Sequence, residues 1–140
     1  MRYFIVLTIV ALASTAAYCE EPAQPNFLES PEHYSELHWI TNASGDKFWV
    51  ANQLLIGNRT GGTVEFWVSI IGPNFHQCGV AGLAQKLSAA QYKYEEGKCR
   101  LLFKFDKQRA MIHDVNGYCQ QESCGARASL EGATFVRVPK

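Results

Sequence analysis

Alternation of apolar and polar residues recurs from Glu36 to the end of the chain, and this period of two is typical of half-buried β-strands. The clearest case is Thr63 to Ile71, whose apolar face consists of Val64, Phe66, Val68 and Ile70. Trp67 lies on the opposite and more polar face, between Glu65 and Ser69. This segment therefore predicts a strand with one face towards a core.

Weaker alternation predicts further short strands, over residues 36–41, 47–50, 75–84, 92–95, 99–106, 109–115 and 134–138, and residues 54–57 form a short apolar run. Turn-forming residues separate them, most clearly the run from Asn58 to Gly62, in which glycines adopt positive φ at low cost. About seven short strands with frequent turns predict an all-β fold, a mainly antiparallel meander that forms a small sandwich or barrel.

One segment fits two kinds of element. Residues 81–90 place Leu83, Leu87 and Ala90 on one face of a short helix, which is the alternative to a strand there. Gly82 disfavours the helix. The fold prediction therefore includes one short helix at this position as an option.

The N-terminus has the three-part layout of a secretory signal peptide. Arg2 is followed by an apolar run from Phe4 to Ala13 and then by small residues. The run is shorter than the roughly 20 residues that span a bilayer. We place the signal peptide at residues 1–19, with cleavage after Ala16 or Ala17 as the alternative, and a less favoured reading makes Cys19 a lipid anchor.

The remaining chain divides into a polar leader and one domain. Residues 20–34 contain Pro22, Pro25 and Pro31 and predict a flexible leader, and residues 35–140 predict a single domain. Loss of Arg2 with the signal peptide leaves 12 basic against 13 acidic residues. A nearly neutral surface gives no electrostatic reason to expect a nucleic acid partner.

Four cysteines follow Cys19, and an even number in an exported protein predicts disulfides. They are Cys78, Cys99, Cys119 and Cys124. Four cysteines allow three pairings, and we favour Cys78–Cys99, which would join neighbouring strands, with Cys119–Cys124, which would close a short loop. The rival is a metal site that includes His76 and Cys78, but zinc sites usually bring cysteines in closer pairs. We therefore expect neither a metal nor another cofactor.

The usual catalytic patterns do not occur in the sequence. It contains no G-x-S-x-G, H-E-x-x-H or P-loop motif. Two adjacent pairs, Glu95-Glu96 and His113-Asp114, carry suitable groups, but neighbouring side chains on a strand point to opposite faces. The sequence therefore predicts a protein that is not an enzyme.

Two residues are candidates for binding. Trp67 is predicted to be exposed on the polar face of its strand, and tryptophan is enriched in interface hot spots. Arg127 follows Cys124 closely, so a disulfide would fix its position for an anionic partner. Trp39 and Trp49 are predicted to lie in the core. Asn42-Ala43-Ser44 and Asn58-Arg59-Thr60 match the N-glycosylation sequon.

The C-terminal half of the chain resembles small secreted proteobacterial proteins that are mostly uncharacterised. The likeness consists of the four cysteines, the Cys-Gly-Ala-Arg run that ends at Arg127, and the later Gly132 and Phe135. It implies a periplasmic β domain. A weaker likeness of residues 39–68 is to adhesin-like surface domains, and a likeness of class alone is to periplasmic lysozyme inhibitors.

Together these patterns predict an exported, non-enzymatic binding domain of the bacterial envelope, whose partner is a protein or an envelope component. A periplasmic lysozyme inhibitor is the first alternative. A small hydrolase or metal-binding protein is the second.

Overall fold

The computed structural model describes residues 24, 26–27, 30–59 and 61–140. The predicted signal peptide with Cys19 lies outside the described residues, as does part of the predicted leader. The first strand begins at Glu32, inside the segment assigned to the leader from sequence.

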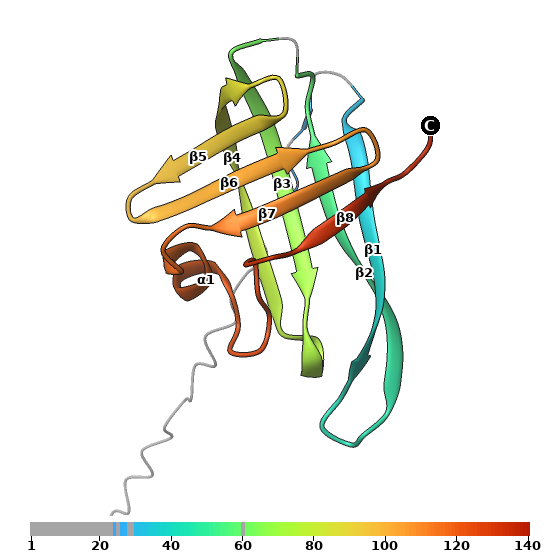
Figure 1. Ribbon diagram of the computed structural model, residues 1–140. Helices are drawn as coiled ribbons and strands as arrows, with labels where there is room; N and C mark the ends of the chain where they lie inside the picture. The colour runs from blue at the N-terminus through green and yellow to red at the C-terminus, as the bar shows by residue number, and fades with distance from the viewer. Residues whose placement is uncertain (1–23, 25, 28–29, 60) are drawn as a thin grey trace, which may run out of the picture.

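Eight antiparallel strands form a closed barrel in which each strand pairs with its neighbours in the chain and the last pairs with the first (Figure 1). The strands are β1 (Glu32–Thr41), β2 (Lys47–Ile56), β3 (Thr63–Ile71), β4 (Gln77–Ser88), β5 (Gln91–Glu96), β6 (Cys99–Phe105), β7 (Arg109–Asp114) and β8 (Thr134–Arg137). The predicted all-β meander is confirmed, and of the two predicted shapes the chain adopts the barrel.

Aromatic and aliphatic side chains fill the interior of the barrel. The largest buried side chains include Tyr34, Leu54, Phe66, Tyr92, Leu101, Phe103, Ile112, Leu130 and Phe135. The ring centroid of Phe66 lies 5.0 Å from that of Tyr94 and 4.7 Å from that of Phe103. Such contacts add to the burial of apolar area, which drives the closure of the sheet.

The optional helix at residues 81–90 is wrong, because Gln77–Ser88 is strand β4. Gly82 has a packing role there. A Cβ atom at this position would lie 2.5 Å from a ring carbon of Tyr94, so glycine makes room for the tyrosine ring. The short helices lie elsewhere: the 3-10 helix η1 (Pro73–Phe75) precedes β4, and α1 (Tyr118–Ser123) follows β7 in a segment predicted to be a loop.

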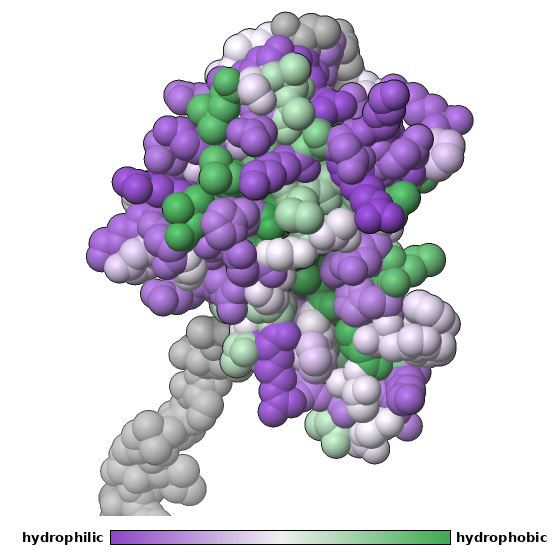
Figure 2. All heavy atoms as spheres, in the orientation of Figure 1, coloured by the Kyte–Doolittle hydropathy of each residue, from purple (hydrophilic) through white to green (hydrophobic). Residues whose placement is uncertain are grey.

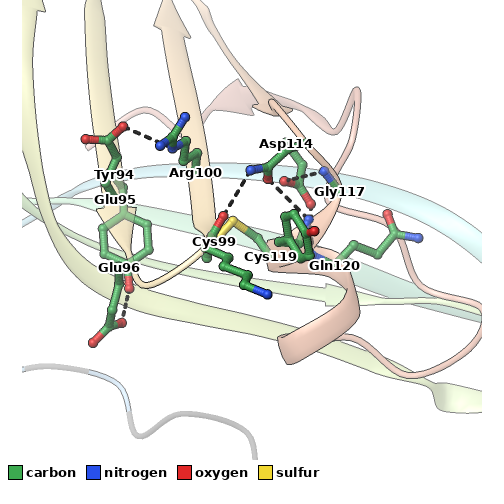
Figure 3. The surroundings of a disulfide bond; sticks show 12 residues. Tyr94, Glu95, Glu96, Cys99, Arg100, Asp114, Gly117, Cys119 and Gln120 are labelled. Atoms are coloured by element: carbon green, nitrogen blue, oxygen red, sulfur yellow. Dashed lines mark hydrogen bonds and ion pairs between the residues drawn. A yellow bond between two sulfur atoms is a disulfide. The ribbon is translucent and has the colours of Figure 1, made fainter.

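All four cysteines form disulfides, as predicted, but the favoured pairing is wrong. The bonds are Cys78–Cys124 and Cys99–Cys119. Cys78 and Cys99 do not lie on neighbouring strands, because β5 separates β4 from β6. Cys119 lies in α1 and Cys124 ends it, and side chains five positions apart on a helix project from different faces. Both disulfides therefore fasten the helical segment to the sheet. Figure 3 shows the bond between Cys99 and Cys119.

Residues 117–130 form what we call the cap segment, which contains α1 and packs against the barrel. Cys119, Ala128 and Leu130 are buried in the core cluster. The carboxylate of Asp114 accepts hydrogen bonds from the backbone N–H groups of Gly117, at 3.1 Å, and Gln120, at 2.8 Å (Figure 3). The carboxylate thus satisfies N–H groups at the start of α1 that have no partner within the helix.

Candidate binding surface

The hairpin of β1 and β2 projects beyond the barrel. β2 pairs with β3 only from Gln53 to Ile56, and β1 pairs with β8 only at Tyr34 and Ser35. Residues 36–52 therefore form a two-stranded ribbon, which we call the arm (Figure 1). Its two strands remain in unbroken register, from Glu36 opposite Asn52 to the tip.

Side chains of the arm hold it in place where the ladder with β3 ends. The Asn52 side chain accepts a hydrogen bond from the backbone N–H of Ile71 at 2.8 Å, and Nε2 of His38 lies 2.8 Å from the carbonyl oxygen of the same residue. Because that oxygen can only accept, Nε2 of His38 carries the proton and donates. The amide of Asn52 also donates to Glu36 at 2.9 Å. The last residue of β3 is thus bound to both strands of the arm, which fixes the angle of the ribbon.

The outer face of the arm is apolar and open to solvent. Trp39 and Trp49 are directly opposite each other in the ladder, and their ring centroids lie 4.1 Å apart. Their exposed fractions are 54% and 59%, and that of nearby Leu37 is 70%. Pale and green spheres mark this part of the molecule in Figure 2. Two stacked indoles on a held ribbon form a pre-shaped aromatic platform.

A second aromatic contact supports the arm from its inner side. The ring centroids of Phe48 and Phe75 lie 5.2 Å apart, and Ile40 beside Phe48 is buried. Phe75 has a φ of 57°, a left-handed conformation that is uncommon for a bulky residue. This conformation places the Phe75 ring against Phe48 of the arm. Uncommon backbone conformations of this kind cluster at functional sites.

Charged residues are few on the arm. Asp46 and Lys47 lie at the tip, where Asp46 accepts a hydrogen bond from the Asn42 side chain at 3.1 Å, and Glu36 lies at the base. The platform of Leu37, Trp39 and Trp49 carries no ionisable group. The surface therefore suits a partner that offers apolar or aromatic contact and has no need of strong electrostatic attraction.

The core assignment of Trp39 and Trp49 is wrong, since both are exposed. Alternation places Trp39 on the same face as Leu37, and the register of the ladder places Trp49 there too. It does not specify whether that face is covered, and beyond the barrel no second layer of the described residues lies over it. An exposed tryptophan pair is therefore the feature that sequence reasoning missed. A signal was present, because two tryptophans flank a polar turn at matching distances from it.

Trp67 is not exposed, contrary to the prediction, whereas Arg127 is exposed near Cys124 as predicted, and its role in binding stays a prediction. Trp67 projects away from the core cluster, as its place in the alternation requires, yet it is only 7% exposed, so its ring is not available to a partner. Arg127 is exposed and lies in the cap segment. Its carbonyl oxygen would be 2.4 Å from a Cβ atom at Gly72, so the backbone there packs closely against the start of η1.

The candidate catalytic pairs have structural partners. Nδ1 of His113 lies 2.7 Å from the Glu131 carboxylate, while Asp114 binds the backbone at the start of α1. The two neighbouring side chains have different partners, as the strand geometry predicts, and the backbone N–H of Asp114 also donates to Glu131 at 2.6 Å.

The two adjacent glutamates also diverge. Glu95 forms ion pairs with Lys93, at 2.9 Å, and with Arg100, at 3.3 Å. The hydrogen bond from Lys93 is the main cause that lowers the pKa of Glu95. Glu96 instead accepts a hydrogen bond from the Tyr94 hydroxyl. Burial and this hydrogen bond raise the pKa of Tyr94.

The predicted rival metal site fails at Cys78, whose sulfur is bonded to Cys124. Among the described residues, no group of three or more His, Cys, Asp and Glu side chains is arranged to hold a metal ion. Within that same part of the chain, no helix has the length and apolar character needed to cross a membrane.

The two disulfides indicate an oxidising compartment outside the cytoplasm. Comparison of the chain with family models, with curated proteins and with solved structures finds no match.

Proposed function

We propose that the mature chain is an exported, non-enzymatic binding domain of the bacterial envelope, placed in the periplasm or secreted, and that its arm recognises a protein or an envelope component. The observation that carries the proposal is the exposed, stacked pair of Trp39 and Trp49 on a projecting ribbon. The oxidising compartment indicated by the disulfides supports export.

The exposed platform has an energetic cost in the free protein. Exposed apolar area costs roughly 25 cal/mol for each Å² that a partner would otherwise cover. Large aromatic residues also carry the greatest share of the binding energy in protein interfaces. The contacts of the arm with Ile71 and Phe75 order the platform before it binds, so little conformational entropy is lost on association.

A lysozyme inhibitor is the second candidate, and the shape of the arm favours it. The arm is two strands wide, so it suits insertion into the open cleft of an enzyme, and its apolar platform would contact the walls. A cell-wall turbidity assay with C-type, G-type and I-type lysozymes tests this. Protection at micromolar protein by the wild type, but not by a Trp39→Ala/Trp49→Ala variant, is the expected result for an inhibitor.

The general proposal is tested by capture from cell-envelope extract followed by measurement of affinity for the captured component. The variant Trp39→Ala/Trp49→Ala is compared with Leu83→Ala/Leu87→Ala, which removes two exposed apolar side chains of β4 outside the arm. We expect the tryptophan variant to bind at least about tenfold more weakly, as for the loss of hot-spot residues. The leucine variant should bind as the wild type does. Equal binding by both variants would refute the role of the arm.

A further inference from the structure

We propose that two copies of this chain associate through the free edge of β1 in the arm. The two edges run antiparallel about a twofold axis near Trp39 and join the two arms into one four-stranded sheet. Such self-association is separate from recognition of an envelope partner.

The direction of the backbone groups defines the free edge. The carbonyl oxygen of His33 accepts a hydrogen bond from the N–H of Val138 at 2.8 Å, so His33 faces the β8 side of β1. Along an antiparallel strand, alternate residues direct both backbone groups to the same side. Leu37, Trp39 and Thr41 therefore direct their N–H and C=O groups to that side too. The ladder with β8 covers only Tyr34 and Ser35, which leaves these groups beyond its end.

The edge formed by residues 37–41 has no lysine, proline or bulge to keep it from pairing with another strand. Lysine, proline, bulges and short length normally protect an exposed edge from pairing with another chain. Residues 37–41 contain no lysine, proline or glycine, and their register with β2 runs without a shift. The other edge of the arm differs, because Lys47 begins β2 and the side chain of Asn52 binds Ile71 beside it.

A twofold arrangement about Trp39 fits the residues of the edge. Leu37 of one copy lies opposite Thr41 of the other, so no like charges meet, and about six backbone hydrogen bonds can form. Residues directly opposite in an antiparallel pair point to the same face. Both Trp39 rings therefore remain on the outer face and extend the aromatic platform. Because each arm projects beyond its barrel, the two barrels lie at opposite ends of the joined sheet (Figure 1).

The size of the contact sets its strength. Trp39 is about half exposed and Leu37 is mostly exposed, so the contact can bury at most an apolar area on the order of 200 Å² in each copy, judged from full burial of about 150–250 Å² for an aromatic side chain. Stable specific interfaces bury about 800 Å² on each partner. The edge contact is therefore that of a weak dimer, for which we expect a Kd between about 10 µM and 1 mM.

Sedimentation equilibrium of the mature protein between about 10 µM and 1 mM tests the proposal, with two matched proline variants. Thr41 and Lys47 lie opposite each other in the arm and direct their N–H groups to opposite edges. Thr41→Pro removes a donor from the β1 edge, and Lys47→Pro removes one from the β2 edge. We expect at least tenfold weaker dimerisation for Thr41→Pro and little change for Lys47→Pro.

Three results would overturn the proposal: a monomer across the whole concentration range, an unchanged dimer in Thr41→Pro, or an equal loss in both variants. If near-ultraviolet circular dichroism shows that Thr41→Pro disturbs the tryptophan pair, Leu37→Lys decides instead, since Leu37 is exposed and lysine protects edges. Its control is Leu83→Lys on β4. We expect at least tenfold weaker dimerisation for Leu37→Lys and unchanged dimerisation for Leu83→Lys. Equal dimerisation of the two variants would refute the edge assignment.

The dimer needs no ligand, so its failure is distinct from failure of the proposed function. A monomeric protein whose Trp39→Ala/Trp49→Ala variant loses an envelope partner keeps the function and removes the dimer. A dimeric protein whose Trp39→Ala/Trp49→Ala variant captures envelope components as the wild type does keeps the dimer and removes the proposed function.

Discussion

The cap segment and the arm place their apolar residues in opposite ways. In the cap segment Cys119, Ala128 and Leu130 point into the core, and two disulfides fasten it to β4 and β6. In the arm Trp39 and Trp49 point to solvent, and side-chain hydrogen bonds to Ile71 hold the ribbon. The difference separates two uses of apolar surface. The first completes a small core, and the second is kept open although burial would be favourable.

The largest expected effect comes from breaking the cap segment free. Cys78–Cys124 spans 46 residues of sequence and Cys99–Cys119 spans 20. On the chain-entropy model, Cys78→Ala/Cys124→Ala should lower the free energy of unfolding by about 4 kcal/mol and Cys99→Ala/Cys119→Ala by about 3 kcal/mol. Urea denaturation of both variants measures this. A loss below about 1 kcal/mol in both would show that packing alone holds the cap segment.

Two buried tyrosines allow the base of the arm and the cap side of the barrel to be compared by pH. Burial and the hydrogen bond to Glu32 raise the pKa of Tyr34, in β1, to about 12. The folded-state pKa lies above the ordinary value near 10, so this contribution to stability is complete below pH 10 and is lost as the pH rises towards 12.

The expected loss from Tyr34 is on the order of 2 kcal/mol across that interval. The pKa of Tyr94, which interacts with Glu122 of the cap segment, is raised as well. Tyr34→Phe and Tyr94→Phe should each flatten the fall of stability between pH 10 and 12, as measured by urea denaturation at fixed pH. An unchanged slope in Tyr34→Phe would exclude its phenol as the titrating group.

A smaller effect is expected at the start of α1. Asp114→Ala removes the acceptor of the backbone N–H groups of Gly117 and Gln120 and should cost about 1.5 kcal/mol. Asp114→Asn keeps one oxygen acceptor and should cost about half as much. Thermal unfolding of the two variants checks the order. A larger loss in Asp114→Asn would contradict the capping role.

Much of the barrel was predictable from the sequence, and the reason is visible in β3. Val64, Phe66, Val68 and Ile70 all lie in the core cluster, so alternation alone identifies the strand and its inner face. Pairing of distant segments was not predictable in the same way. The favoured bond between Cys78 and Cys99 assumed adjacent strands, and the position of β5 between them is a property of the closed sheet.

The candidate site shows a different limit. Periodicity assigns a residue to a face, but coverage of that face depends on the whole fold. Trp67 therefore lies on the predicted face and is buried, while Trp39 was predicted to be buried and is exposed. Small residues give a similar lesson, since Gly82 indicates a close contact with Tyr94 that no local pattern specifies.

The smallest expected effect on stability comes from the largest exposed side chains. Trp39→Ala removes a ring that is more than half exposed and whose main aromatic contact is Trp49. Such a pair contributes about 0.5–1.5 kcal/mol, so we expect a loss of about 1 kcal/mol or less in the free energy of unfolding, measured by urea denaturation. The same variant should weaken binding of an envelope partner at least about tenfold.

The contrast between a small effect on stability and a large effect on binding distinguishes the arm from the cap segment most sharply. Truncation of a residue that serves the core mainly lowers the free energy of unfolding, by about 3–5 kcal/mol for a large apolar residue inside a barrel. Phe103→Ala, in the interior, is the matched control. If Trp39→Ala lowered stability as much as Phe103→Ala, the arm would be part of the folding unit in the same sense as the cap segment. A small loss of stability together with weakened binding would instead mean that the tryptophans are kept exposed in the free protein for a partner that covers them in the complex.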